Sequence, residues 1–362
     1  MKSKSLNKTR NMNIFLNLTK RHFLVFFKDK MRLFYTLMVP LIVLLVYVFF
    51  LRQLEVSSAS SILNNFKDSY GNFLGSNQEV KKEVSTLIDS WMLSGILAIS
   101  TLSVSIQTNN IIVNDKENGV NRDFSSSPIS KNVLICSYFL FNFLVTLLIC
   151  FVVLLICLVY MLANNELIGS IDFLDFLIII GVLILTTILS TLITLFICSF
   201  VKKESTLASL IAVISAAAGF LFGAYMPFSM LPNWVRNVCA FFPGTYQTSL
   251  FRFAFLRGPI ENAINLFNDL KIVSLDGSSS SDLMEQLNSS FGYNLNFFNH
   301  EITPLMSLIF VVLCIILFIV LNIIFGSRLT QVAGDKVKKL TKKTTKVISS
   351  KKDKIFDDKK SD

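Results

Sequence analysis

The fold of the chain is organised around one polar stretch, Asn114-Asp-Lys-Glu-Asn-Gly-Val-Asn-Arg-Asp-Phe-Ser-Ser-Ser-Pro-Ile-Ser-Lys131. It carries six charged residues and separates two long apolar runs, at about 90–113 and 132–163. Because about 20 apolar residues of helix cross a bilayer core, each run can span the membrane, and the polar stretch between them must lie in water. Gly119 permits a sharp turn and Ser127-Pro128 restricts the backbone. These residues predict a short helix parallel to the membrane with a turn at each end; the alternative is an ordinary solvated loop.

The composition is that of a membrane protein. Hydrophobic residues make up 52% of the chain, charged residues 16%, and the mean hydropathy is +0.60, whereas a soluble domain carries about 25% charged residues. The net charge of +10 could suggest a nucleic-acid partner, but 26 of the 34 Lys and Arg residues gather in four segments: 1–32, 114–131, 202–203 and 327–362. Loops rich in Lys and Arg stay in the cytosol. We therefore expect a multi-pass protein of the plasma membrane with both termini cytosolic, contacting lipids and no nucleic acid.

The apolar runs predict six membrane spans, at about 33–51, 90–113, 133–162, 173–200, 206–224 and 304–326. Residues 1–32 mix aromatic and basic side chains, which is typical of a cytosolic arm ending in an amphipathic interfacial helix. Outer loops are expected at 52–89 and 258–303, and a basic cytosolic tail at 327–362. The predicted fold class is an all-α polytopic membrane protein.

Polar and small residues inside the spans are candidates for a transport pathway or a subunit interface: Thr101, Ser105, Gln107, Asn109, Gly219 and Gly223. A further Thr and Ser stripe at 186–194 more often serves helix packing than substrate contact. After the fifth span, three prolines within 227–243 prevent one continuous spanning helix. Irregular backbone at membrane depth must be shielded by protein, so short re-entrant or interfacial helices are expected there.

Several kinds of chemistry are disfavoured by the sequence. No Gly is followed by Lys, which excludes a Gly-x-x-x-x-Gly-Lys phosphate loop. The inner parts of the spans hold no ionisable residue, although proton- and ion-coupled transporters usually place such groups in the membrane. The six cysteines and two histidines show no spacing typical of a disulfide framework or a metal site. We expect no catalytic residue, no cofactor and no metal in this chain.

The residues Lys116-Glu117-x-Gly119, followed after eight residues by Pro128-Ile129-Ser130, resemble the hinge between the second and third spans of ABC-2 type exporter permeases. The resemblance covers most of the chain, including Phe23–Phe27, which is similar to the family's elbow helix. It also includes the broken segment after the fifth span, carried here by Pro227, Pro232, Trp234, Pro243, Tyr246 and Arg252.

This resemblance implies a permease subunit whose hinge is a coupling helix that docks on a separate ATPase. The residues expected to couple the two are Lys116, Glu117, Gly119, Arg122 and Pro128. The implied partners are two ATPase copies, which bind ATP-Mg, and a second permease that is either identical or paralogous. The implied cargo is an amphipathic drug, antimicrobial peptide or lipid-linked compound moved outward.

Two other functions have compatible hydropathy. A membrane-embedded enzyme is disfavoured because no nucleophile–base pair or metal set is present in the sequence. A membrane sensor or immunity protein would bind its ligand without transporting it, and its spans would look the same. The hinge favours coupling to an ATPase over both alternatives.

Overall fold

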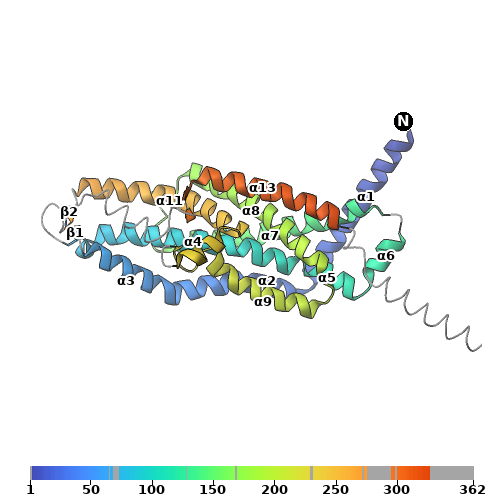
Figure 1. Ribbon diagram of the computed structural model, residues 1–362, viewed down its shortest axis with the longest axis horizontal. Helices are drawn as coiled ribbons and strands as arrows, with labels where there is room; N and C mark the ends of the chain where they lie inside the picture. Colours follow the sequence, from blue (N-terminus) through green and yellow to red (C-terminus); the bar gives the residue numbers. More distant parts are fainter. Residues whose placement is uncertain are drawn as a thin grey trace, which may run out of the picture.

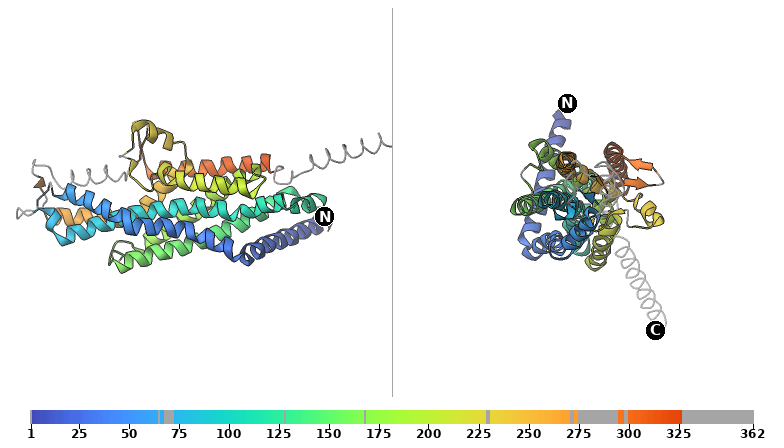
Figure 2. Two further views of the ribbon diagram at one scale, coloured as in Figure 1. Left: turned by 90° about the horizontal axis from the view of Figure 1, so that it is seen from below. Right: turned by 90° about the vertical axis from the view of Figure 1, so that its left-hand side faces the viewer.

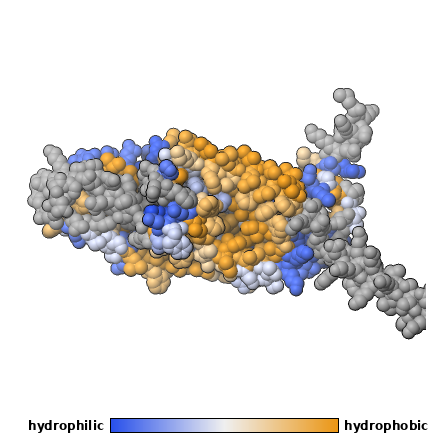
Figure 3. All heavy atoms as spheres, in the orientation of Figure 1, coloured by the Kyte–Doolittle hydropathy of each residue, from blue (hydrophilic) through white to orange (hydrophobic). Residues whose placement is uncertain are grey.

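The computed structural model describes residues 2–326 except 65, 68–72, 128, 168, 229–230, 271–272, 275–294 and 298–299. Within these residues, six helices are long and apolar enough to cross a membrane: Lys30–Ser61, Gln78–Glu117, Lys131–Ala163, Phe173–Phe200, Glu204–Leu221 and Pro304–Phe325. They run along one long axis (Figure 1). On the face shown in Figure 3, apolar residues cover the middle of the molecule, and hydrophilic residues lie beyond them on either side. The chain is an all-α polytopic membrane protein.

The two ends of the bundle differ in what they contain (Figures 1 and 2). One end, here called the hinge end, holds α1 (Lys2–Lys28), α5 (Asn110–Glu117) and α6 (Val120–Ser126). The other, here called the far end, holds the strand pair β1 (Phe66–Lys67) and β2 (Val273–Ser274). A second strand pair, β3 (Leu295–Phe297) and β4 (His300–Ile302), precedes the last helix.

Helix α4 (Gln78–Thr108) is the centre of the bundle. In its apolar stretch 94% of the residues are buried, against 17% in α9 (Glu204–Leu221) and in α13 (Pro304–Phe325). It packs against α2 (Lys30–Val46), α7 (Lys131–Ala163), α8 (Phe173–Phe200), α9 and α11 (Pro243–Asp269). The polar character of α4, which distinguishes it from the other spans, therefore lies inside the protein and not against lipid.

The far end is helical where the sequence predicted loops. The first span continues beyond a π-helical segment, η1 (Tyr47–Leu51), into α3 (Arg52–Leu63), and α4 begins at Gln78 after a short 3-10 turn, η2 (Leu74–Ser76). Helix α11 runs on through Pro259 to Asp269. The reason is a small apolar core in which these three helices meet, formed by Ala59, Leu63, Phe66, Leu74, Val80, Val84, Ile88, Ala263 and Phe267. The expected outer loops 52–89 and 258–303 thus contain α3, the start of α4 and the end of α11.

The proline-broken segment forms one short helix and the start of a long one. Pro232 is the N-cap of α10 (Asn233–Cys239), and Pro243 occupies the first turn of α11, a position where its missing N–H costs nothing. Thr245 donates to the carbonyls of Leu221 and Cys239 at 3.1 and 2.8 Å, and so shields backbone groups of the irregular segment. Short helices were expected here, but the 27-residue length of α11 was not.

Candidate functional site

The hinge between α4 and α7 contains two short helices. Asn109 ends α4, and α5 follows after this break. Gly119 then separates α5 from α6, a seven-residue helix that ends at Ser126 and is followed by Ser127 as its C-cap. The structure therefore has two short helices where one was expected, and it contradicts the simple solvated loop; an orientation parallel to the membrane stays a prediction.

Gly119 makes the turn between the two hinge helices. Its φ of 79° lies in the left-handed region. A residue with a Cβ is strained there by contact with the neighbouring carbonyl oxygen, and glycine is not. This conformational requirement explains the position of Gly119 without any partner protein.

Lys116 does not point to a cytosolic partner. Its ammonium donates to the carbonyl oxygens of Cys198, Ser199 and Val201 at 2.7, 2.8 and 3.2 Å, and the residue is buried. The last carbonyls of a helix have no partner within the helix, so a cation at that end is stabilising. Lys116 was expected to touch the ATPase. In this geometry the Lys116 side chain instead binds the C-terminal end of α8.

Glu117 connects the hinge to the first turn of α9. One carboxylate oxygen of this exposed side chain accepts from the backbone N–H of Glu204 at 2.7 Å. Asn114 donates to the side chain of Glu204 at 2.8 Å, and Arg32 lies 3.8 Å from the same carboxylate. An anion at a helix N-terminus satisfies an unpaired N–H and interacts favourably with the helix dipole.

Asp115, which the sequence did not single out, anchors the hinge to two further helices. Its two carboxylate oxygens each accept from Arg21 of α1 at 2.7 Å, and Tyr138 of α7 donates at 2.6 Å. His22 stacks on Tyr138 with ring centroids 4.2 Å apart, and burial, opposed by Asp115, lowers the pKa of His22 to about 3. The sequence offered one sign of the pair between Asp115 and Arg21, namely an acidic residue in the hinge and a basic N-terminal arm. No spacing rule predicts a pair between residues so distant in sequence.

The structure describes less of the other two residues that were expected to couple the permease to an ATPase, Arg122 and Pro128. Arg122 lies in α6, where the structure describes its backbone position. Pro128 lies outside the described residues. Their roles toward an ATPase stay predictions.

The polar residues of α4 form a buried network with α7 and α8. Ser105 bonds to Asn142 of α7 at 3.0 Å and to Thr194 of α8 at 2.7 Å, and Asn109 donates to Thr194 at 2.8 Å. The hydroxyl of Thr101 accepts from Ser190 at 3.1 Å. Gln107 is half-buried and bonds within α4. Within one protomer these groups pack helices together, as expected for the α8 stripe; a pathway role stays a prediction.

The glycines of the fifth span accommodate aromatic rings of the segment that follows it. A Cβ at Gly219 would lie 1.8 Å from the Tyr225 ring, and one at Gly223, where φ is 64°, would lie 2.4 Å from Phe228. The two glycines that were expected at a subunit interface therefore pack against aromatic side chains of the same chain.

The broken-segment residues have distinct environments. Pro227 is buried, Pro243 and Tyr246 lie against the bundle, and Trp234 is 72% exposed. Tyr246 donates to the carbonyl of Ala240 at 2.9 Å and stacks on Phe310. Arg252 is buried, bonds to the Gly223 carbonyl and lies over Trp91 of α4, 4.5 Å from the ring centroid.

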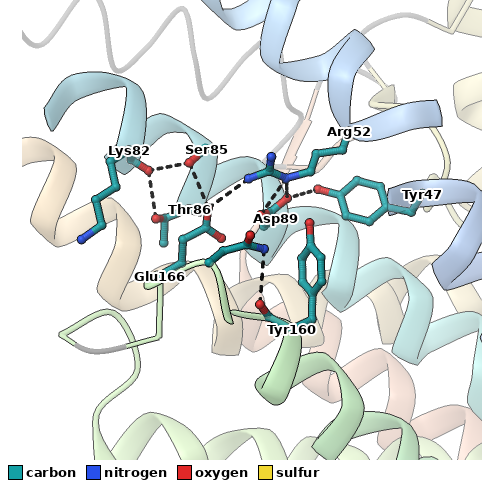
Figure 4. A network of polar contacts seen from close by, with 9 residues as sticks. Tyr47, Arg52, Lys82, Ser85, Thr86, Asp89, Tyr160 and Glu166 are labelled. Atoms are coloured by element: carbon teal, nitrogen blue, oxygen red, sulfur yellow. Dashed lines mark hydrogen bonds and ion pairs between the residues drawn. The ribbon is translucent and has the colours of Figure 1, made fainter. Parts of the chain in front are cut away.

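At the far end, a second buried ionic cluster links three segments (Figure 4). Arg52 Nε lies 3.0 Å from Asp89 Oδ1, and its Nη2 lies 3.1 Å from Glu166 Oε1, in the connection between α7 and α8. Tyr47 donates to Asp89, and Ser85 donates to Glu166 at 3.0 Å. This cluster is here called the far-end clasp.

Comparison with known proteins bears on the whole of this architecture. A sequence profile described as ABC-2 family transporter protein matches residues 52–324, which is well over half of the chain. A comparison with curated proteins finds no match. The profile match extends from α3 to α13 and includes the hinge, the buried network and the far-end clasp except Tyr47.

Proposed function

The chain belongs to the ABC-2 family of transporter proteins, and from this premise we propose that it is the permease subunit of an exporter for an amphipathic compound. The family's membrane domain is a permease that works with an ABC ATPase. The proposed assembly contains two ATPase subunits, which bind ATP-Mg, and a second permease chain.

One observation carries the proposal beyond the family. Three consecutive residues of the hinge each hold a different part of the bundle: Asp115 holds α1 and α7, Lys116 holds the end of α8, and Glu117 holds the start of α9. A force applied to such a segment reaches four helices through direct hydrogen bonds and ion pairs. This is the arrangement that an ATP-driven movement at the hinge requires.

The proposal also includes the orientation of the chain in the membrane and the kind of compound that it transports. The Lys and Arg asymmetry supports a cytosolic hinge end and cytosolic termini. The cargo is amphipathic, such as a drug, an antimicrobial peptide or a lipid-linked compound. Export is proposed because the hinge residues Lys116-Glu117-x-Gly119 and Pro128 resemble those of ABC-2 type exporter permeases.

Inside-out vesicles test this function directly. Vesicles carrying the chain together with its ATPase should accumulate a fluorescent amphipathic probe when ATP is added, and vesicles with an ATPase that cannot hydrolyse ATP should not. A membrane sensor would bind the probe equally with and without ATP. Equal probe uptake in both vesicle types would contradict the proposal.

A further inference from the structure

We propose that the far-end clasp is a proton-binding site: one proton on Glu166, beside Asp89, allows Arg52 to hold α3, α4 and the connection between α7 and α8 together, and loss of that proton loosens them. The clasp joins segments that are distant in sequence, since Arg52 and Glu166 lie 114 residues apart. Neither carboxylate belongs to the hinge or to the buried network of α4.

The charges of the clasp do not balance. The side chains of Asp89 and Glu166 are 0% and 2% exposed, and both depend on Arg52, whose side chain is 30% exposed. Two carboxylates that share a site cannot both ionise easily, because each disfavours the charge of the other and burial disfavours both. One bound proton makes the pair match the single guanidinium.

The surrounding groups determine which carboxyl binds the proton. Asp89 has the fuller set of donors, because Arg52 Nε lies 3.0 and 3.1 Å from its two oxygens and Tyr47 also donates to it. Glu166 receives one bond each from Arg52 and Ser85, both on Oε1, while its buried Oε2 has no hydrogen-bond partner. The proton therefore belongs on Glu166.

Among the residues that the structure describes, Arg52 is the cation paired with the two carboxylates. Besides Asp89 and Arg52, Tyr160 of α7 interacts electrostatically with Glu166, and its phenol points into the clasp; the side chain of Lys82 points away from it (Figure 4). Burial first and Asp89 second raise the pKa of Glu166 to about 8. An unfolded Glu has an ordinary pKa near 4.5. The folded state thus holds more protons between these values, and stability is lost as the pH rises through that window.

The clasp has a consequence for transport that rests on the proposed function. If the hinge end is cytosolic, the far end faces outward, and the clasp responds to the external pH. Alkaline conditions outside would release α3 and α4 from the α7–α8 connection and favour opening of the outer end. The proton site itself does not depend on this assignment.

Thermal unfolding of the full chain in detergent between pH 6 and 9 tests the site. The Tm of the wild-type chain should fall by about 4 °C over this range. Glu166→Gln, which keeps the shape of the protonated side chain, should hold its Tm nearly constant. The matched control is Glu79→Gln, which removes an exposed carboxylate from the same end of α4 and should follow the wild type.

A parallel fall of Tm in the wild type and in Glu166→Gln would overturn the proposal, as would a flat wild-type profile. Should Glu166→Gln fail to fold, Ser85→Ala provides a second route. It removes a donor that favours the ionised form, so the midpoint of the Tm profile should move to higher pH. An unmoved midpoint would also overturn the proposal. Because the assay needs neither ATP nor cargo, its failure would leave the proposed export function standing.

Discussion

The buried ionic clusters at the two ends of the bundle share three residue types and differ in the fourth. At the hinge end, Arg21 pairs with Asp115, Tyr138 donates to the same carboxylate, and the fourth member is His22. At the far end, Arg52 pairs with Asp89, Tyr47 donates to that carboxylate, and the fourth member is Glu166. The same trio of arginine, aspartate and tyrosine thus joins the first helices of the chain to the bundle twice.

The fourth member gives each cluster its own response to pH. Burial lowers the pKa of His22 from 6.5 to about 3, so the unfolded chain binds more protons than the folded one below about 6.5, and stability is lost as the pH falls. Burial and Asp89 raise the pKa of Glu166 to about 8, so stability is lost as the pH rises. In each cluster the matched ion pair fixes the geometry, and the extra titratable group determines the pH range in which the cluster is stable.

The largest effect is expected from breaking the matched pair. Arg21→Met leaves Asp115 charged and buried with no cation, and removing one partner of a buried pair costs about 3–5 kcal/mol. Because the Arg21 side chain is 31% exposed, we expect the lower figure, about 3 kcal/mol. Denaturant titration of the purified chain measures the loss. Arg10→Met, which removes an exposed cation of the same helix, is the control; equal midpoints for the two variants would show that the pair contributes nothing.

Lys116→Met should be the next most destabilising change at the hinge end. It removes three charge-assisted bonds to the end of α8 and leaves buried carbonyls without partners, which we expect to cost about 2 kcal/mol. The same titration measures it, with the exposed Lys131→Met as control. A variant as stable as this control would mean that the carbonyls find other partners.

Asp89→Asn leaves the far-end clasp with one carboxylate for its one arginine. Glu166 should then pair with Arg52 alone and ionise at lower pH than in the wild type, which makes the far end resemble the hinge end. The alkaline fall of Tm, about 4 °C in the wild type, should shrink to less than half. An undiminished fall would show that Asp89 is not the group that raises the pKa of Glu166.

His22→Gln should have the smallest effect, about 1 kcal/mol, confined to acid. Between pH 6.5 and 5 the variant should gain stability relative to the wild-type chain, in which the loss from His22 offsets the gain from Glu166, while the alkaline slopes stay equal. The control is His300→Gln, since His300 is exposed in β4. An acid slope left unchanged by His22→Gln would assign the loss in acid to another group.

Much of the fold followed from the sequence because apolar runs of membrane-spanning length are a strong local signal. The expected span at 173–200 has the bounds of α8, and those at 133–162 and 304–326 lie within two residues of α7 and α13. Residues 52–89 were mistaken for a loop because their apolar positions, such as Ala59 and Leu63, are sparse among polar ones. They become a helix face only when α4 and α11 supply the other half of the core.

The hinge shows where reasoning from sequence stops. Gly119 was predicted to make a turn, and it does, because the left-handed backbone is a local property. The partners of Lys116 and Glu117 could not be predicted, because α8 and α9 approach the hinge only in the folded bundle. Charged residues beside a membrane look the same in sequence whether they face a partner protein or the ends of neighbouring helices.

Coupled ATP hydrolysis in reconstituted vesicles tests the central claim, that the hinge transmits ATP-driven movement to the bundle. Glu117→Ala frees the start of α9, and Gly119→Val strains the turn, so both should abolish probe transport and its stimulation of ATP hydrolysis while the permease still inserts and binds the ATPase. Ser126→Ala, at the exposed end of α6, is the control and should behave as the wild type. If both hinge variants transport and hydrolyse at the level of Ser126→Ala, the hinge is only a connection between helices, and the account is wrong.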